Sequence, residues 1–412
     1  MTAAAPASDR LRLDGPYAWR RLAISLLIGT IGNVGMWAVI MVLPAVSAEF
    51  GGTRADASLP YTLTMAGFAA GNLLIGRWVD RLGVTPILAG AAMALGASFA
   101  AAAFAPSPAI LAAIHLPLGF ATAASFAPLI ADVSHWFLRR RGVAVAAAAS
   151  GNYLAGAVWP LLLSGLLAAE GWRAVYLVLA AVTAGALAPL ALLLRRRPPA
   201  DAHAAAESFA RAARARAEIP PARLQWLLGL AGVGCCIAMA MPQVHIVALC
   251  VDLGYGPAAG AEMLSLMLAA GVVSRLASGW LADRLGGVRT LLIGSVGQCL
   301  ALFLYLPFDG LASLYLVSFV FGLSQGGIVP SYAVVVREYL PAKEAGARVG
   351  FVIMATIVGM AAGGWLSGLI HDLTGSYEAA FLHGIAWNAL NIAIMATLLL
   401  RSGGPRARAS AA

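Results

Sequence analysis

An arginine set deep in an apolar stretch is the residue of this sequence with the clearest capacity for chemistry. Arg275 lies eight residues before Asp283, and apolar and small residues dominate the interval. At about 1.5 Å per helical residue, the arginine is roughly 12 Å from the charged end of that stretch. A planar guanidinium binds a carboxylate through two parallel hydrogen bonds, so we expect Arg275 to bind an organic anion.

Carboxylates that could neutralise this arginine are not predicted at the same depth. The acidic residues associated with the apolar stretches fall at or near their ends: Glu49, Asp80, Asp132, Glu262 and Asp283. A central arginine costs about 2.5–3.5 kcal/mol to insert into a membrane, so it needs a partner, and the substrate is the natural one. The alternative is structural, because a long basic side chain can cap helix carbonyls or extend to the membrane surface.

The elements that must hold Arg275 are membrane-spanning helices. The 412 residues are 61% hydrophobic and 11% charged, whereas a soluble domain is about half apolar and a quarter charged. Apolar runs of about 20 residues cross a bilayer as helix, because lipid offers backbone groups no partner. The sequence predicts an all-α membrane protein with twelve spans, at 22–46, 57–78, 84–105, 109–133, 142–167, 173–194, 224–250, 258–281, 288–307, 310–335, 347–370 and 378–400.

Basic residues are distributed unevenly between the two sides of these spans. The predicted outer loops contain Arg54 and Arg173, whereas nearly all the other basic residues lie in inner loops and in the tails 1–21 and 401–412. Cytoplasmic loops carry such an excess, so both termini are expected in the cytoplasm. The net charge of +9 therefore reflects orientation in the membrane, and no nucleic-acid partner is expected. Segment 1–21 has no signal-peptide pattern and is expected to be a cytoplasmic tail.

An internal repeat divides the spans into two sets of six. GRWVDRLG at 76–83 follows the second span, and GWLADRLG at 279–286 follows the eighth. The long polar segment 195–223 lies between the sets, as an inner loop. We therefore expect two six-helix bundles, 22–194 and 224–400. Alanine-rich composition and a strong excess of arginine over lysine are typical of GC-rich bacterial genomes, so the predicted location is a bacterial inner membrane.

Two halves of six helices with this loop sequence in matching positions resemble the major facilitator superfamily over nearly the whole chain. The resemblance implies parallel repeats that rock about a site near the membrane midplane. It also implies that the loop sequence takes part in conformational gating; the residues concerned are Gly76, Asp80, Arg81, Gly83, Gly279, Asp283, Arg284 and Gly286. For the arginines, the alternative is an orientation signal alone.

A second resemblance points to a smaller group of transporters within that superfamily. WFLRRRGVAVAAAASG at 136–151 is similar to the fifth-helix signature of monocarboxylate transporters and of the bacterial oxalate/formate exchangers. Arg275, four residues before Gly279, stands where those transporters have their substrate-binding arginine. The resemblance implies secondary transport of a small organic anion, by proton-coupled symport or by anion exchange. In the exchanger pattern, aromatic residues of helices one, four and five enclose the ligand, and Trp37, Phe126 and Tyr153 lie near those positions.

Other polar residues within the spans are candidates for the same pathway. Asn152 and Tyr153 stand among small residues of the fifth span, and Gln325 lies in the glycine-rich GLSQGGIVP stretch of the tenth. Polar side chains there can face a solute, although ordinary helix packing explains each of them as well.

Three histidines are predicted inside the membrane. His115, His245 and His383 lie in the fourth, seventh and twelfth spans. Imidazole gains and loses a proton near physiological pH, so each is a candidate for proton coupling, with His383 and His245 preferred. A lone histidine in a helix bundle more often makes an interhelical hydrogen bond, and that alternative stands for all three.

The sequence also departs from the family pattern. Animal monocarboxylate transporters place an acidic residue one turn before the arginine and a lysine in the first helix, whereas here Gly271 holds the former position and the first span has no lysine. Proton coupling by that pair is therefore excluded. The oxalate exchanger has a second cationic residue where this chain has Thr356. A single arginine suits a monocarboxylate, or an anion with one dominant carboxylate.

Two further classes of function are weighed. Efflux of apolar drugs or metabolites is the alternative within transport, but it leaves a deep positive charge unexplained. An enzyme or sensor would need a nucleotide loop, a metal cluster or a soluble domain, and the sequence predicts none, nor any cofactor. Cys235, Cys236, Cys250 and Cys299 lack metal-ligand spacing. The expected partners are the anion, membrane lipid, and protons or a counter-anion, for a monomeric protein.

Overall fold

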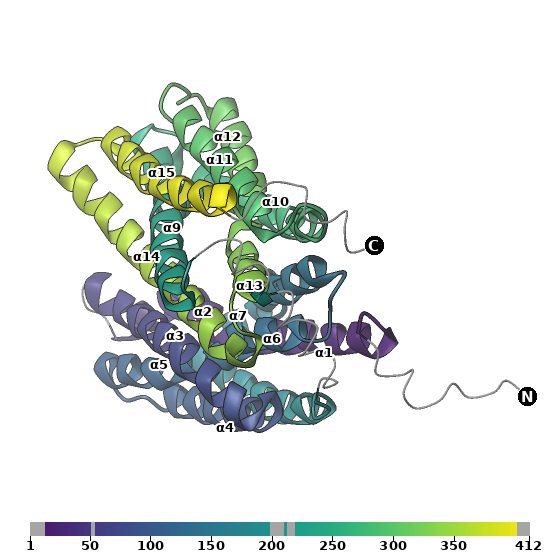
Figure 1. Cartoon of the computed structure of the whole chain (residues 1–412). Coiled ribbons are helices and arrows are strands. Elements are labelled where there is room, and N and C mark those ends of the chain that lie inside the picture. The colour runs from purple at the N-terminus through teal and green to yellow at the C-terminus, as the bar shows by residue number, and fades with distance from the viewer. Residues whose placement is uncertain (1–12, 51–53, 198–209, 212–218, 402–412) are drawn as a thin grey trace, which may run out of the picture. The chain divides into compact units, whose positions relative to one another are not determined.

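The computed structural model describes residues 13–50, 54–197, 210–211 and 219–401, and these are almost entirely helical (Figure 1). The first half of the chain forms α1 (Pro16–Gly32), α2 (Val34–Phe50), α3 (Arg54–Leu82), α4 (Val84–Ala103), α5 (Pro108–Thr122), the 3-10 helix η2 (Ala123–Ser125), α6 (Ala127–Ser134) and α7 (Arg141–Leu193). The second half forms α9 (Pro221–Asp252), α10 (Gly256–Leu285), α11 (Gly287–Leu304), α12 (Leu311–Gln325), α13 (Ile328–Tyr339), the 3-10 helix η3 (Ala342–Glu344), α14 (Ala345–Thr374) and α15 (Tyr377–Arg401).

Ten segments of the described residues are long and apolar enough to cross a membrane. The other two predicted spans correspond to α3 and to the part of α7 before Gly171. Both carry polar side chains within the span: Thr62, Thr64 and Asn72 on α3, and Ser150 and Asn152 on α7. In its described residues the protein is an all-α membrane protein, and the ten apolar segments together with these two more polar helices correspond to the twelve predicted spans, which confirms the predicted class.

Three spans that hydropathy predicts as single helices are interrupted near their middle. The first passes from α1 to α2 at Asn33, the fourth from α5 through η2 to α6, and the tenth from α12 to α13 at Gly326 and Gly327. Backbone groups freed by such breaks need donors or acceptors from neighbouring helices. Asn33 serves two of the breaks, because its Nδ2 donates to the carbonyl oxygens of Gly29 at 2.7 Å and Ser125 at 3.0 Å.

The repeated loop sequence forms the same structure twice. Gly83 follows α3 with φ +88°, and Gly286 follows α10 with φ +88°. This left-handed conformation is open to glycine because it has no Cβ. A helix, a one-glycine turn and the next helix therefore recur in both halves. Gly171, with φ +78°, similarly separates the two helices joined in α7, where the sequence predicts separate spans 142–167 and 173–194.

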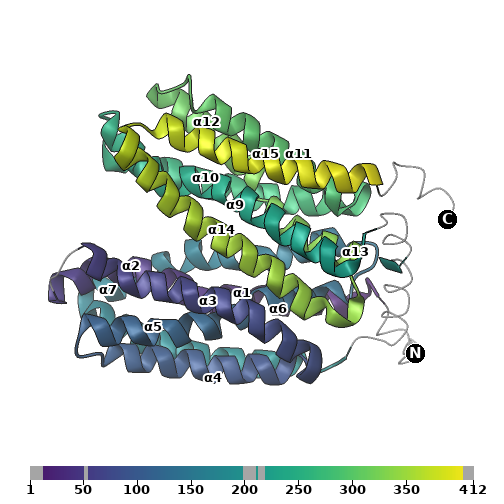
Figure 2. The ribbon, with the colours of Figure 1, turned by 60° about the vertical axis from the view of Figure 1, so that its left-hand side comes forward.

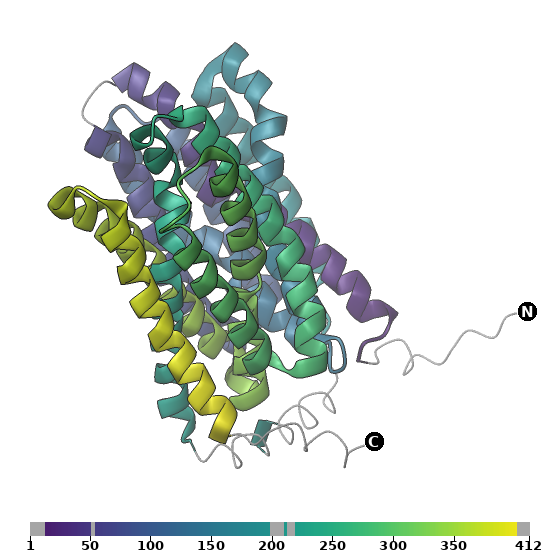
Figure 3. The same ribbon diagram turned by 90° about the horizontal axis from the view of Figure 1, so that it is seen from above.

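Contacts divide the chain into two compact units. The first contains Met1–Leu138, Ala147–His203 and Lys343–Phe351; the second contains Arg139–Ala146, Ala204–Ala342 and Val352–Ala412. In the first unit α4 and α3 both pack along α5 (Figure 2). In the second, α15, yellow in Figure 3, packs along α9 and α11. The start of α7 thus belongs with the second unit, and the start of α14 with the first.

A buried ion pair fixes the beginning of α1 in the first unit. Arg21 is 2% exposed and Asp132 8%. Nε and Nη2 of Arg21 donate to the two carboxylate oxygens at 2.7 and 2.8 Å, and Nη1 donates to the carbonyl oxygen of Arg196 at 3.1 Å. The sequence predicts Arg21 as the last residue of a polar tail, whereas α1 begins at Pro16 and carries Arg21 into the core. Paired hydrogen bonds offset the cost of burying both charges.

Candidate functional site

Arg275 lies on α10, inside the second unit, with 4% of its surface exposed. Its Nε donates a 3.0 Å hydrogen bond to the carbonyl oxygen of Gly326, at the break between α12 and α13. In a continuous helix that carbonyl would accept from the amide of residue 330, but Pro330 has no N–H. Arg275 supplies the missing donor. The structural role that the sequence raised as an alternative is therefore present, and it holds the guanidinium at the break.

Glycines bring α10 directly against this break. A methyl group at Gly326 would lie 2.2 Å from the carbonyl oxygen of Gly271, and one at Gly327 would lie 1.9 Å from Ser278 Oγ. Both distances are far below ordinary contact. Because Gly271 is one helical turn before Arg275, the arginine extends from a backbone that already touches the break.

Gln325 is the last residue of α12 and precedes the carbonyl that Arg275 holds. It is 1% exposed, and within the described part of the chain neither its Oε1 nor its Nε2 has a hydrogen-bond partner. A buried amide without partners costs about 1–3 kcal/mol. The structure thus places two predicted binding residues, Arg275 and Gln325, at the same interruption of one half.

Trp37 on α2 and Asn152 on α7 come together in the first unit. Trp37 Nε1 donates to the side-chain oxygen of Asn152 at 2.9 Å and to its main-chain oxygen at 3.0 Å. The indole lies against Gly156, where an added methyl group would come 2.8 Å from the ring. Asn152 is buried and Trp37 half-buried. The amide therefore fixes the orientation of an aromatic ring that remains partly uncovered.

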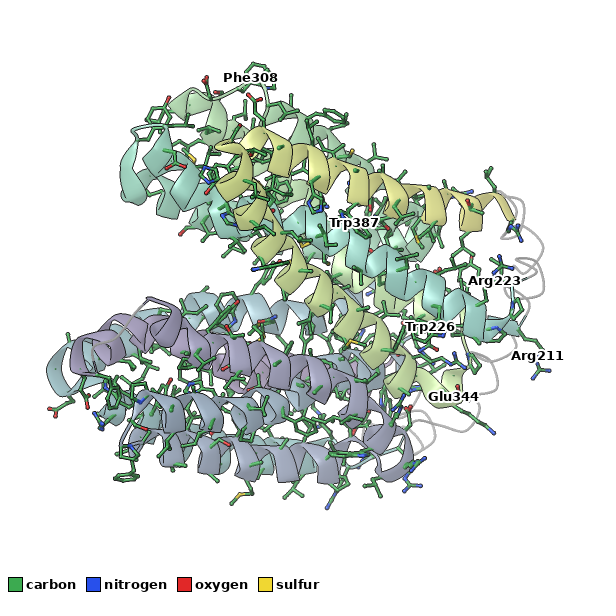
Figure 4. The ribbon with its side chains drawn as sticks, turned by 90° about the vertical axis from the view of Figure 1, so that its left-hand side faces the viewer. Arg211, Arg223, Trp226, Phe308, Glu344 and Trp387 are labelled. Carbon is green, nitrogen blue, oxygen red and sulfur yellow. The ribbon has the colours of Figure 1, made fainter. Side chains whose placement is uncertain are left out.

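Replacing Asn152 by alanine is expected to raise the KM for the transported solute about tenfold. The change removes the side-chain acceptor of the indole N–H and leaves only the main-chain oxygen of Asn152. The ring is then held less firmly in its orientation, and a lost hydrogen bond of this kind costs about 0.5–1.5 kcal/mol. The measurement is the concentration dependence of solute exchange in proteoliposomes. Trp226→Phe is the control, because Trp226 is 69% exposed near the start of α9 (Figure 4). An unchanged KM in Asn152→Ala would remove Asn152 from the binding residues.

The other two aromatic candidates are placed differently. Phe126 stands at the break between η2 and α6, 5% exposed, with its ring centre 5.9 Å from that of Phe68. Tyr153 is half-buried and follows Asn152 on α7. Consecutive helical residues point about 100° apart, so Tyr153 does not share the direction of Asn152. The structure joins Trp37 with Asn152, whereas Phe126 packs with Phe68.

Two of the three candidate histidines have partners for both ring nitrogens. His115 Nδ1 lies 2.7 Å from the carbonyl oxygen of Leu111, and its Nε2 lies 3.0 Å from the hydroxyl of Tyr176. His245 Nε2 lies 2.8 Å from the carbonyl oxygen of Gly364, and its Nδ1 faces the hydroxyl of Tyr377 at 3.5 Å. These are the interhelical contacts that the ordinary alternative expects.

His383 differs from the other two. Its Nε2 accepts a 3.0 Å hydrogen bond from the indole of Trp387 (labelled in Figure 4), also on α15. Its Nδ1 is buried and has no partner within the described residues. Since Nε2 accepts, a neutral His383 must carry its proton on Nδ1.

Asp80 caps the N-terminus of α14. Its Oδ1 and Oδ2 accept hydrogen bonds from the main-chain N–H groups of Gly346 and Ala347 at 2.9 and 2.8 Å. The first amides of a helix have no acceptor within the helix, and the positive end of the helix dipole attracts a carboxylate. Gly76 allows the approach, because a methyl group there would lie 2.2 Å from the carbonyl oxygen of Gly346.

Asp283 makes the equivalent contact with α7. Its carboxylate accepts from the main-chain N–H groups of Gly142 and Val143, the second at 3.1 Å. A methyl group at Gly279 would lie 2.7 Å from the carbonyl oxygen of Gly142. The repeat at 76–83 and 279–286 thus produces two matching clasps, each made of an aspartate and the start of a helix.

The arginines of the repeat lie at exposed positions. Arg81 is exposed. Arg284 is also exposed, and its guanidinium lies 3.8 Å from the ring centre of Trp280. The sequence predicts that the aspartates and arginines of the repeat form clasps between neighbouring helices; in the structure Asp80 and Asp283 accept hydrogen bonds from helix N–H groups.

Replacing Asp80 or Asp283 by alanine is expected to lower the maximal transport rate about 5–20-fold with little change in KM. A lost helix cap costs about 0.5–2 kcal/mol, which shifts a two-state equilibrium by that order. Rates and KM would be measured in proteoliposomes. Glu344→Gln is the control, because it removes an exposed carboxylate two residues from Gly346. A raised KM at an unchanged maximal rate would contradict a role in gating.

Asn33 and His371 were not predicted from the sequence, although both take part in polar contacts between segments. Asn33 could have been predicted, because an asparagine in the middle of an apolar span needs a hydrogen-bond partner. A hydropathy profile does not mark such a residue. His371 lies in the last turns of α14, 3.5 Å from Asp252 Oδ2 on α9. The sequence around His371 resembles that of many helix ends, so its contact with Asp252 is evident only from the structure.

Comparison with known proteins matches the chain to a family model and to named transporters. The model of the Major Facilitator Superfamily matches residues 26–311 and again 226–412. Rat monocarboxylate transporter 13 is 26% identical over 396 residues, covering 93% of this chain and 90% of the relative. Mouse monocarboxylate transporter 11 is 30% identical over 401 residues, covering 90% and 84%. An uncharacterized transporter of the same superfamily from Bacillus subtilis is 27% identical over 350 residues, covering 81% and 83%.

Solved structures share the fold at low sequence identity. The human organic anion transporter MFSD10 (TETRAN) superposes with a TM-score of 0.72 at 18% identity, covering 93% of this chain and all of the other. The Escherichia coli fucose:proton symporter FucP gives a TM-score of 0.70 at 16% identity, covering 94% and 100%.

Proposed function

Because the chain belongs to the Major Facilitator Superfamily, we propose that it is a secondary transporter of small organic anions with one dominant carboxylate. Arg275 holds the carboxylate while the halves 22–194 and 224–400 work by alternating access. The observation that carries this proposal is a guanidinium with 4% exposure on a membrane-spanning helix. No redox or group-transfer chemistry is involved, and the solute crosses unchanged.

The surroundings of Arg275 suit an anionic ligand. Its contact with the carbonyl oxygen of Gly326 fixes the orientation of the guanidinium. A substrate carboxylate supplies both the opposite charge and a planar pair of acceptors. Gln325, whose buried side chain has no partner among the described residues, offers a donor and an acceptor to the remainder of the solute beside the same break.

The relatives support the same class of solute. The mammalian relatives are named as monocarboxylate transporters, and they are matched over most of their length. We assign the first half a contribution through the indole of Trp37, oriented by Asn152, and through Tyr153 and Phe126. Aromatic faces of this kind pack against the apolar part of a small acid.

We further propose how the transporter is gated and how it is oriented in the membrane. The clasps of Asp80 and Asp283 stabilise one state of the cycle, and their release opens the other. By the distribution of basic residues, this end of the helices faces the cytoplasm together with both termini. We place the protein, as a monomer, in a bacterial inner membrane.

Counterflow in proteoliposomes tests the proposed function. Vesicles loaded with unlabelled acid would be exposed to labelled propionate, lactate or benzoate, and in parallel to the corresponding uncharged amides and to a lipophilic cation. We expect at least one acid to exchange, and neither its amide nor the cation to do so. Protein-free vesicles give the background. Transport of the lipophilic cation without any acid would contradict the proposal and favour efflux.

A further inference from the structure

Four titratable side chains from three helices meet at one end of the second unit. Asp252 and His245 lie on α9, His371 on α14 and Tyr377 on α15. We call these four residues the histidine–tyrosine cluster. Arg275 and Gln325 lie on other helices, α10 and α12.

The members form a continuous series of contacts. His371 Nε2 lies 3.5 Å from Asp252 Oδ2. The His371 ring is stacked on Tyr377, with ring centres 4.2 Å apart and planes at 28°. The hydroxyl of Tyr377 lies 3.5 Å from His245 Nδ1, and those two rings are 5.5 Å apart. The series ends where His245 Nε2 meets the carbonyl oxygen of Gly364 at 2.8 Å.

The contacts of His245 define how it takes up a proton. A carbonyl oxygen accepts only, so Nε2 must donate to Gly364, and the neutral ring has its acceptor at Nδ1, facing Tyr377. A proton added at Nδ1 would be donated to the tyrosine oxygen while the bond to Gly364 persists. Protonated His371 in turn gains an ion pair with Asp252. Both imidazoles can therefore become charged without losing a contact.

The cluster runs from the surface into the helices. The side chains of Asp252 and His371 are 51% and 29% exposed. His245 precedes Asp252 by about two helical turns, so it lies roughly 10 Å farther in. Gly368 leaves room for its ring, because a methyl group there would come 3.3 Å from His245 Cε1. Since Asp80 caps the first turn of α14, about 40 Å of helix separates that clasp from His371.

An acidic residue adjoins the cluster on α15. Glu378 follows Tyr377 on α15 and is exposed. Two positive charges a few ångströms apart repel each other. The cluster therefore suits one proton at a time.

We propose that the histidine–tyrosine cluster is a proton-binding site, which takes a proton from the side opposite the aspartate clasps and couples it to anion movement. The inference rests on the proposed function, and places that side outside the cell. One proton carried with one monocarboxylate moves no net charge. The site replaces the acidic residue and lysine of the animal transporters, whose positions this chain does not fill with ionisable groups.

Gradient-driven uptake tests the proposal. Proteoliposomes would receive labelled propionate, lactate or benzoate with the outside more acidic, and accumulation would be compared with counterflow at equal pH. We expect accumulation in the wild type and a loss of about tenfold in His245→Gln and in His371→Gln, within the ~5–150-fold range of site coupling. Counterflow should persist in both variants, which also shows that they are folded.

His115→Gln is the matched control. It too removes a histidine bonded to a carbonyl oxygen and a tyrosine hydroxyl, but in the first unit. Full accumulation in both cluster variants would overturn the proposal. A wild type that performs counterflow but ignores the gradient would overturn it too, while the proposed function stands. A wild type without counterflow would overturn both. His371→Gln, at a partly exposed position, keeps the test valid if His245→Gln does not fold.

Discussion

Arg275→Ala is expected to reduce carboxylate exchange at least about 100-fold. Removing one member of a buried, hydrogen-bonded charge pair costs about 2–5 kcal/mol, and 2.7 kcal/mol corresponds to that factor. The loss should appear in kcat/KM for every transported acid, because the carboxylate is the part that the acids share. Initial rates of counterflow, normalised to the amount of folded protein in the vesicles, measure it.

Arg275→Lys separates charge from geometry. Lysine keeps the positive charge but lacks the planar fork that binds two carboxylate oxygens, so we expect exchange between that of the wild type and that of the alanine variant. Arg223→Ala removes an exposed arginine at the start of α9 (Figure 4) and should exchange like the wild type. If Arg275→Ala exchanges acids at the wild-type rate, the role of the arginine is structural, as in its hydrogen bond to the carbonyl oxygen of Gly326.

Asp132→Asn is expected to destabilise the protein by about 3–5 kcal/mol. The pair of Arg21 and Asp132 is almost wholly buried, and removing one partner leaves an uncompensated charge inside the first unit. Replacing both residues, as Arg21→Met with Asp132→Leu, should cost much less, because no charge remains buried. Denaturant or thermal unfolding in detergent measures both variants.

Glu344→Gln provides the matched control for this stability prediction. Glu344 forms an ion pair with Arg348 one turn later, but its side chain is 58% exposed (Figure 4). Exposed pairs contribute about 0–1 kcal/mol, so this variant should unfold close to the wild type. Equal stability losses in Asp132→Asn and Glu344→Gln would contradict a special role of the buried pair.

Much of the architecture follows from the sequence, because hydropathy and the distribution of charge reflect the membrane itself. The turns at Gly83 and Gly286 and the gap at Gly171 occur where the sequence predicts them. The break at Gly326 does not follow from hydropathy, since glycine and proline are common within membrane helices. Its partner, Arg275, lies some fifty residues away and is found only by the fold.

The sequence predicts which residues belong to the candidate site, but it does not predict which of them contact one another. Trp37 and Asn152 were separate predictions, and their hydrogen bond depends on how α2 packs on α7. The repeat identified Asp80 and Asp283, but the helix N–H groups that they bind belong to segments far along the chain. Contacts between distant segments depend on tertiary packing, and local sequence patterns do not encode them.

Direct binding of a carboxylate to the solubilised protein tests the central claim without the influence of gating or coupling. Labelled acid, chosen as the one that exchanges fastest, would be titrated against purified wild type and Arg275→Ala in detergent, with both variants verified as folded. We expect saturable binding to the wild type that the uncharged amide does not displace, and no saturable binding to Arg275→Ala. Equal affinity of the two proteins would contradict the assignment of the carboxylate to Arg275.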